Sequence, residues 1–156
     1  MNESSINDPQ NGIRLMDNRD YPAVRDLWAG TTGMGLNEVD DSPDGIRRYL
    51  ERNPRTCFVC EDGGSVVGAI LAGHDGRRGF IYHACVAETH RKRGIGRGLA
   101  DAAMNALKAE GISKTALVVF GRNRQGNAFW ERLGFELRTD LNYRNKAIVP
   151  LKRVDT

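Results

Sequence analysis

Residues 80–99 of this 156-residue chain combine an apolar segment, a basic glycine-rich turn and the start of a helical pattern. Aromatic and β-branched side chains dominate residues 80–87 and predict a strand. A short polar turn follows, and residues 91–98 (RKRGIGRG) then lead into the helix-forming residues 99–108. A glycine-rich turn at a helix start directs unpaired backbone N–H groups, and the positive end of the helix dipole, towards one point. The turn therefore predicts a site for an anion such as a pyrophosphate.

The basic side chains of this turn favour the same interpretation, although they could instead form a solvated surface loop. Arg91, Lys92, Arg93 and Arg97 surround the glycines with positive charge, and a residue without Cβ lets a phosphate approach the backbone closely. The residue pattern does not match two familiar phosphate-binding motifs. No Gly-Lys pair is present for a P-loop, and Leu99 stands where the dinucleotide fingerprint needs its third glycine.

The turn also resembles a family signature. Residues 91–96 fit the [RQ]-x-x-G-x-[GA] acetyl-CoA signature of the GNAT (Gcn5-related) N-acetyltransferases, and residues 84–86 stand where that family has its preceding strand. Residues 123–135 contain an Asn, an aromatic pair and then Gly-Phe, and resemble the second signature of the family. Two motifs in the same order and at about the same spacing are more specific than either alone. The resemblance, to a small bacterial-type single-domain member, covers residues 11–152.

This resemblance implies an α/β fold with a mixed, mostly antiparallel, splayed sheet of about seven strands and four helices. It places acetyl-CoA in the V between the fourth and fifth strands, here residues 80–87 and 115–120. The N–H of Ala84 would stabilise the oxyanion that forms when an amine attacks the thioester. The cofactor-binding residues that the resemblance implies are Ala84, Cys85, Val86, Arg91, Lys92, Arg93, Gly94, Ile95, Gly96, Asn123 and Trp130.

The chain departs from common family patterns at the groups that move protons. Phe80 and Val118 stand where relatives often carry Glu, and Trp130 where they often carry Tyr. None of these three side chains can act as an acid or a base, although the indole N–H of Trp130 could donate a hydrogen bond to the cofactor. The departing thiolate could receive its proton through water.

Tyr82, His83 and Tyr143 are the candidates for the base that takes the proton from the amine. Strict alternation along a strand turns Tyr82 to the same face as Phe80 and Ala84, towards the cleft, and turns His83 to the other face as a core or interface histidine. Tyr143 belongs to the expected loop of the last hairpin, where some family members meet the acceptor. Both tyrosines could instead serve only in packing, so no base is assigned.

The loop at residues 30–44 is the expected acceptor side. It is locally acidic in a basic protein, and its carboxylates could draw a cationic amine to the cleft. They could also be the solvated entrance of the next helix. The substrate-side candidates are Glu38, Asp40, Asp41 and Tyr143.

The remaining pattern supplies the elements that must position these groups. Residues 1–10 are expected to be a mobile tail and residues 11–156 a single domain. The helix after the turn crosses between two strands, which implies one parallel pair in an otherwise antiparallel sheet. Strands are expected at 12–16, 56–61, 65–73, 80–87 and 115–120, helices at 21–29, 43–52, 95–109 and 123–133, and a closing hairpin at 135–139 and 146–152.

Composition narrows the class of protein. The chain is 40% hydrophobic and 28% charged, as is usual for a globular domain, and its net charge of +3 is too small to argue for nucleic acid. No apolar run approaches the roughly 20 residues of a membrane span. Cys57, Cys60 and Cys85 have no second Cys or His pair at metal spacing, so free thiols in a reducing cytoplasm, without a metal, are expected.

The function expected is transfer of an acetyl group from acetyl-CoA to a primary amine, of a small molecule or a peptide, by direct attack in a ternary complex. No nucleic acid or membrane partner is expected, and a homodimer is left open. Two alternatives remain at this point. One is a module that senses acetyl-CoA without turning it over, and the other is a nucleic-acid binder that uses residues 91–98 as a basic loop.

Overall fold

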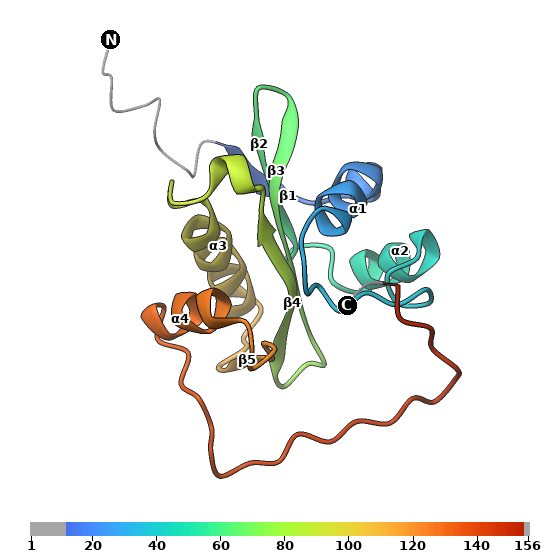
Figure 1. Ribbon diagram of the computed structural model, residues 1–156, viewed down its shortest axis with the longest axis vertical. Coiled ribbons are helices and arrows are strands. Elements are labelled where there is room, and N and C mark those ends of the chain that lie inside the picture. Colours follow the sequence, from blue (N-terminus) through green and yellow to red (C-terminus); the bar gives the residue numbers. More distant parts are fainter. Residues whose placement is uncertain (1–11, 155–156) are drawn as a thin grey trace.

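A five-stranded sheet lies between two pairs of helices in the computed structural model, which describes residues 12–154 (Figure 1). The expected N-terminal tail, residues 1–10, lies outside the described residues. In chain order the elements are β1 Ile13–Leu15, the 3₁₀ turn η3 Asn18–Asp20, α1 Tyr21–Ala29, α2 Pro43–Arg52, β2 Phe58–Asp62, β3 Ser65–His74, β4 Gly79–Val86, the 3₁₀ turn η4 Glu88–His90, α3 Ile95–Ala109, β5 Thr115–Leu117 and α4 Arg124–Arg132.

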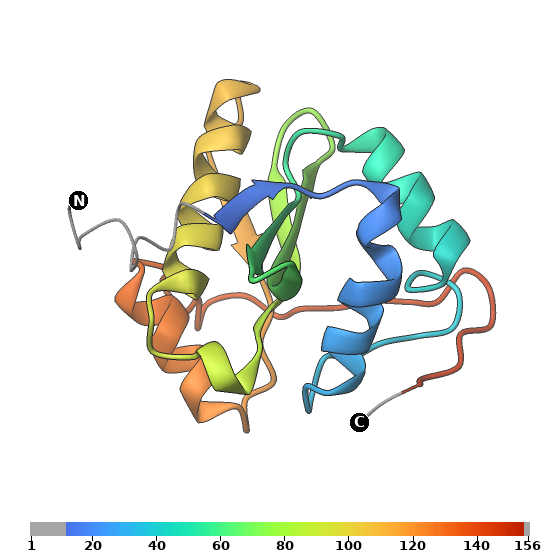
Figure 2. The same cartoon turned by 90° about the horizontal axis from the view of Figure 1, so that it is seen from above.

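The strands lie in chain order, β1-β2-β3-β4-β5, and all neighbours are antiparallel except the parallel pair β4 and β5. Figure 2 shows α3 and α4 on one face of the sheet and α1 and α2 on the other. Each face has its own core. Leu99, Ala103 and Leu107 of α3 pack on one face, whereas Trp28 of α1 and Ile46 of α2 pack on the other. The expected mixed sheet with one parallel crossover is confirmed.

Local sequence signals explain where the helices and turns begin. The Ser42 hydroxyl accepts a hydrogen bond from the Gly45 N–H at 3.0 Å, and Pro43 occupies the first turn of α2, as preferred at a helix N-terminus. Between β2 and β3, Gly63 and Gly64 have φ angles of +58° and +81°. Two positive φ angles are what a tight two-residue hairpin turn requires.

The closing hairpin expected at 135–139 and 146–152 is wrong, and the described residues form five strands instead of about seven. Residues 136–151 contain no strand and run in an open arc from the end of α4 towards α2 (Figure 1). A single bridge joins Arg153 to Asn37. The ends of a hairpin must lie side by side, whereas here the two ends of the segment are held at different sides of the domain. The fifth strand is also shorter than the expected 115–120, since β5 covers only Thr115–Leu117.

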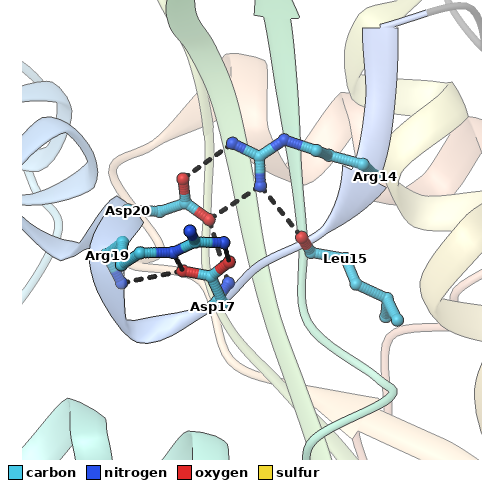
Figure 3. A pocket seen from close by; sticks show the side chains of 5 residues that line it. All are labelled: Arg14, Leu15, Asp17, Arg19 and Asp20. Carbon is cyan, nitrogen blue, oxygen red and sulfur yellow. Dashed lines mark hydrogen bonds and ion pairs between the residues drawn. The ribbon is translucent and has the colours of Figure 1, made fainter.

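A hollow beside β1 is lined by side chains that form ion pairs (Figure 3). The Arg14 guanidinium donates to both carboxylate oxygens of Asp20, at 2.8 and 2.7 Å, and to Glu61 at 2.7 Å. Arg19 donates to Asp17 at 2.8 Å in the same hollow. Since these carboxylates already have cationic partners, the hollow is a structural network that ties β1 to the start of α1.

This network makes stability depend on pH in the acid range. The hydrogen bonds from Arg14 hold the pKa of Asp20 below its ordinary value. Its contribution is present above the unfolded carboxyl pKa of about 3.9 and is lost as the pH falls through the lowered folded pKa. Arg14 is 40% exposed, which screens the pair. We expect Asp20→Asn to lower the free energy of unfolding by about 1–2 kcal/mol at pH 7.

Urea unfolding at several pH values measures this effect. The difference between the wild type and Asp20→Asn should shrink below about pH 4. The control Glu61→Gln removes the outer carboxylate of Arg14 and should change stability by less than about 0.5 kcal/mol. A difference for Asp20→Asn that stays constant down to pH 2 would contradict the assignment.

Candidate active site

The parallel pairing of β4 and β5 stops early. Gly79, Phe80 and Ile81 pair with Thr115, Ala116 and Leu117, and the pairing stops there because β5 ends at Leu117. Residues 82–86 of β4 therefore have no strand partner on the β5 side within the described chain. Their backbone N–H and C=O groups on that side form an open edge inside the domain. An extended ligand with amide groups can pair with such an edge as an additional strand.

A β-bulge lies in this open part of β4. Leu71 pairs with Tyr82 and Ala69 pairs with Cys85, so two steps along β3 correspond to three steps along β4. The extra residue lies at His83 or Ala84. A bulge changes which side chains share a face, and Cys85 consequently packs in the same core as Leu71.

The bulge corrects the expected direction of His83. Strict alternation predicted that His83 would face away from Tyr82, but their ring centroids are 6.4 Å apart and His83 contacts the edge of Trp28 at 4.9 Å. Both residues therefore lie on the α1 and α2 side of the sheet. Ala84, the expected oxyanion donor, follows them and is exposed.

His83 forms a short hydrogen bond with Asp41, 2.6 Å between Nε2 and Oδ1. Asp41 is only 5% exposed, and its other carboxylate oxygen accepts the Asn37 N–H at 2.8 Å. The second ring nitrogen of His83, Nδ1, has no hydrogen-bond partner in the described chain and is not fully buried. The arrangement is a histidine oriented by a buried carboxylate, with one nitrogen available.

The pair was missed from the sequence because its members are 42 positions apart. The acidic loop and the histidine were each visible, but only the bulge and the path of the α1–α2 loop bring them together. Both carboxylate oxygens of Asp41 therefore already form hydrogen bonds, one with His83 and one with the Asn37 N–H. Asp40 and Glu38 are exposed, and Asp40 accepts a hydrogen bond from the Asn37 amide at 2.9 Å.

Tyr82 and Tyr143, two of the expected proton-transfer residues, are both exposed. Tyr82 is 47% exposed and its ring contacts Phe80, with centroids 4.6 Å apart. Burial raises the pKa of Tyr82, and the nearby Tyr143 and Asp40 raise it further. A phenol with a raised pKa stays protonated at neutral pH, which suits a hydrogen-bond donor better than a base.

The turn that precedes α3 has the backbone of an anion site. Lys92 and Gly94 have φ angles of +62° and +81°, and Lys92 is the one residue other than glycine with a positive φ in the described chain. No side chain caps the start of α3, so its first N–H groups remain available. A Cβ on Gly96 would lie 3.2 Å from the Phe129 ring. The two sequence signatures therefore meet at this point.

The other residues of the two signatures have structural contacts. The Arg91 side chain donates to the Val86 carbonyl at 3.2 Å, which ties the turn to the end of β4. Asn123 caps α4 by accepting the Gly126 N–H at 2.9 Å. Trp130 is 9% exposed and packs between Phe129 and Phe135, with ring centroids 4.9 and 5.0 Å away. Trp130 is thus mainly part of the core beneath α3 and α4.

The cysteines do not offer a nucleophile. Cys57, Cys60 and Cys85 are free and buried. Burial raises the pKa of the Cys85 thiol to about 12, so it is protonated at neutral pH. Within residues 12–154, no three side chains of His, Cys, Asp or Glu are grouped so that they could hold a metal ion. No helix among these residues is both long and apolar enough to cross a membrane.

Comparison with known proteins gives this geometry a family. A family model described as "Acetyltransferase (GNAT) family" matches residues 21–135. An acetyltransferase of Sodalis glossinidius (strain morsitans) is 31% identical over 137 residues, which cover 88% of this chain and 95% of that protein. Ard1 from Thermoplasma volcanium has a similar fold, with a TM-score of 0.72 and 22% identity over 81% of this chain and 82% of that one.

A further solved structure is AAC(6')-Iy in complex with the bisubstrate analogue CoA-S-monomethyl-acetylneamine. It is 20% identical, with a TM-score of 0.65, and the match covers 86% of this chain and 97% of that one. The fold, the two signatures and these matches agree. The chain belongs to the GNAT acetyltransferase family and is an acyltransferase that takes its acetyl group from acetyl-CoA.

Proposed function

We propose that this protein transfers the acetyl group to a primary amine by direct attack of the amine on the thioester in a ternary complex. The observation that carries the proposal is the open edge of β4 at residues 82–86, which leads into the uncapped turn at 91–96. A carrier with an amide-containing arm and a diphosphate matches these two features in order. The raised pKa of the buried Cys85 thiol argues against a covalent acetyl-enzyme at the nearest thiol.

The cofactor is proposed to bind mainly through peptide groups. Its arm pairs with the backbone of residues 84–86, and its diphosphate accepts the N–H groups of residues 91–96. Lys92 and Arg93 add positive charge around the turn. Asn123 and Trp130 support the site from α4, where Asn123 fixes the start of the helix and Trp130 fixes its packing. None of these contacts requires a metal ion. The proposed location, a reducing cytoplasm, is supported only by the free thiols.

The chemical step requires stabilisation of negative charge. When the amine nitrogen bonds to the thioester carbon, the carbonyl oxygen becomes an oxyanion. A fixed backbone N–H that points at this oxygen stabilises the transition state without reorganisation, and removal of one such donor typically costs about 10²–10³ in rate. We assign this role to the Ala84 N–H, since the bulge at residues 83–84 leaves it on the open edge.

The attacking amine must also lose a proton. We assign the proton acceptor to His83, whose available Nδ1 would take the proton while Asp41 stabilises the resulting imidazolium through its 2.6 Å hydrogen bond. The intermediate then expels the CoA thiolate, which receives a proton from the Tyr82 or Tyr143 hydroxyl or from water. The raised pKa of Tyr82 fits a donor.

The acceptor is proposed to be a cationic amine. Asp40 and Glu38 are exposed on the loop beside the mouth and can attract positive charge. In the AAC(6')-Iy structure an acetylneamine part is joined to CoA, and that ligand is a property of that protein. For this chain the proposal extends to amines of small molecules or peptides, with no nucleic acid involved.

A second candidate is a module that binds acetyl-CoA without turnover. The absence of a titratable group at Phe80, Val118 and Trp130 favours it. Thermal unfolding with and without acetyl-CoA, followed by a panel of amines with detection of the released thiol, separates the two. A ligand at 100 times its Kd should stabilise the protein by about 2.7 kcal/mol. Stabilisation without thiol release for any amine would support the binding module, and no stabilisation at all would contradict both.

One prediction of this proposal concerns the turn at residues 91–96 that would bind the diphosphate. Gly94 and Gly64 both have a φ angle of +81°, so Ala at either position should cost about 1–2 kcal/mol of stability from backbone strain. Only Gly94→Ala disturbs the turn before α3, and it should weaken binding of CoA at least tenfold in isothermal titration calorimetry. Gly64→Ala is the matched control and should bind CoA normally. Equal affinities of the two variants would argue against a diphosphate at this turn.

The second prediction concerns the proposed base. His83→Gln should lower kcat by about 10²–10⁴ with little change in CoA affinity, because only proton transfer is removed. Asp41→Asn should lower kcat in the same direction by removing the orienting charge. Circular dichroism and CoA binding check that both variants fold. A kcat within threefold of the wild type in His83→Gln would remove His83 from the mechanism.

The third prediction concerns acceptor charge. Asp40→Asn should raise KM for a cationic acceptor several-fold while leaving kcat and the KM for acetyl-CoA unchanged, and the effect should fade in high salt. The matched control is Asp44→Asn, which removes another exposed carboxylate of the same region, at the start of α2. Equal KM values for Asp40→Asn and the wild type would exclude this carboxylate from acceptor binding.

A further inference from the structure

Two arginine side chains stack on one aromatic ring that follows β5. The guanidinium carbon of Arg122 lies 4.4 Å from the centroid of the Phe120 ring, and that of Arg153 lies 5.1 Å from it. Arg122 belongs to the segment between β5 and α4, whereas Arg153 lies near the end of the described chain. Only the fold brings them together. These three residues are named here the Phe120 cluster.

The two positive charges of the Phe120 cluster have no anionic partner. Both arginines are exposed, and neither guanidinium forms an ion pair or a hydrogen bond with another residue in the described chain. Stacking uses the face of a guanidinium, so the five N–H donors at its planar edge remain free. The ring therefore holds two cations in place with their donors available for an anion.

The backbone of Arg153 is fixed against the loop between α1 and α2. A bridge between Asn37 and Arg153, with a backbone hydrogen bond on either side of 2.9 and 3.1 Å, joins residues 36–38 to residues 152–154 (Figure 1). The same loop reaches the ring itself, since a Cβ on Gly35 would lie 3.8 Å from Phe120. The position of the cluster is thus set by the loop that carries the acidic residues of the proposed acceptor side.

Asn37 connects the cluster to the proposed base. Its backbone N–H donates to Asp41 at 2.8 Å, and Asp41 forms the 2.6 Å hydrogen bond with His83. The bridge to Arg153 is made by the same residue. A single loop therefore positions both the carboxylate partner of the proposed base and one of the two free cations.

This attachment favours the acceptor over the phosphates of CoA as the source of the anion. The proposed diphosphate turn leads into α3, which lies on the opposite face of the sheet from α1 and α2 (Figure 2). Arg153 is joined to the loop between α1 and α2. The cluster is therefore attached on the side where Asp40 and Glu38 were proposed to attract the amine.

We infer that the Phe120 cluster binds a carboxylate of the acceptor, so that the acceptor is an amine that also carries a carboxylate, as an amino acid does. The inference rests on the proposed function, because it narrows the cationic amine to a molecule with both charges. The planar edge of a guanidinium matches the two oxygens of a carboxylate. The acidic loop attracts the ammonium group and the cluster attracts the carboxylate, so the two charges fix the direction in which the acceptor binds.

Matched pairs of ligands test the inference on the full chain. The probes are the standard L-amino acids, each compared with its α-carboxamide, which keeps the amine and loses the negative charge. Calorimetry with CoA bound measures their affinity without turnover. At least one amino acid should bind about tenfold more tightly than its amide. Equal affinities of every acid and its amide, or no binding of any acid, would overturn the inference.

Variants that remove one charge each locate the carboxylate. Arg122→Gln and Arg153→Gln should each reduce the preference for acid over amide about tenfold, with the affinities for the amide and for CoA unchanged. The matched control Arg48→Gln removes an exposed guanidinium on α2 and should keep the preference. Circular dichroism checks the folding of all three. A preference that survives in both cluster variants would overturn the inference, and weaker CoA binding in either would do so by assigning the cluster to a CoA phosphate.

Thiol release from acetyl-CoA separates this inference from the proposed function. Transfer to the amides as readily as to the acids would overturn the carboxylate site and leave acetylation of amines intact. Binding that selects the acid and depends on both arginines, without thiol release for any amine, would contradict the proposed function and leave the carboxylate site in place.

Discussion

The early end of the pairing between β4 and β5 is the constraint on which the rest of the structure depends. Three residue pairs join the strands, and β5 ends at Leu117 while β4 continues to Val86. The crossover through α3 makes this pair parallel, and α3 begins at the turn that follows β4. The free peptide groups of β4 and the free N–H groups of α3 therefore belong to one continuous stretch of chain. A cofactor can bind there without displacing a hydrogen bond of the sheet.

The bulge in β4 determines the direction of the side chains along this open edge. One additional residue between Tyr82 and Cys85 keeps Cys85 in the core and turns His83 to the side of Asp41. The α1–α2 loop is held in turn by hydrogen bonds from its own backbone, including the Asn37 N–H to Asp41. A buried carboxylate without a partner would be costly. The pair with His83 satisfies the charge of Asp41 and at the same time orients an imidazole beside the site.

Two peripheral segments of the domain differ in how far their groups find partners within the chain. Around β1, Arg14 pairs with Asp20 and Glu61, and the charged groups are satisfied within the chain. In residues 136–151, by contrast, the apolar side chains are exposed and the peptide groups have no backbone partner within the described chain.

The sequence by itself determined the order of the elements, the anion turn and the family, since these follow from local signals. Glycines at positive φ, Ser42 and Asn123 as helix caps, and the spacing of the two signatures act over a few residues. Only the tertiary structure decided the direction of His83, its partner Asp41 and the fate of the C-terminal segment. A bulge shifts side-chain direction by one residue without a clear sequence signal. Strand pairing depends on which edge is free and on where the two ends of a segment are held, and both are properties of the assembled fold.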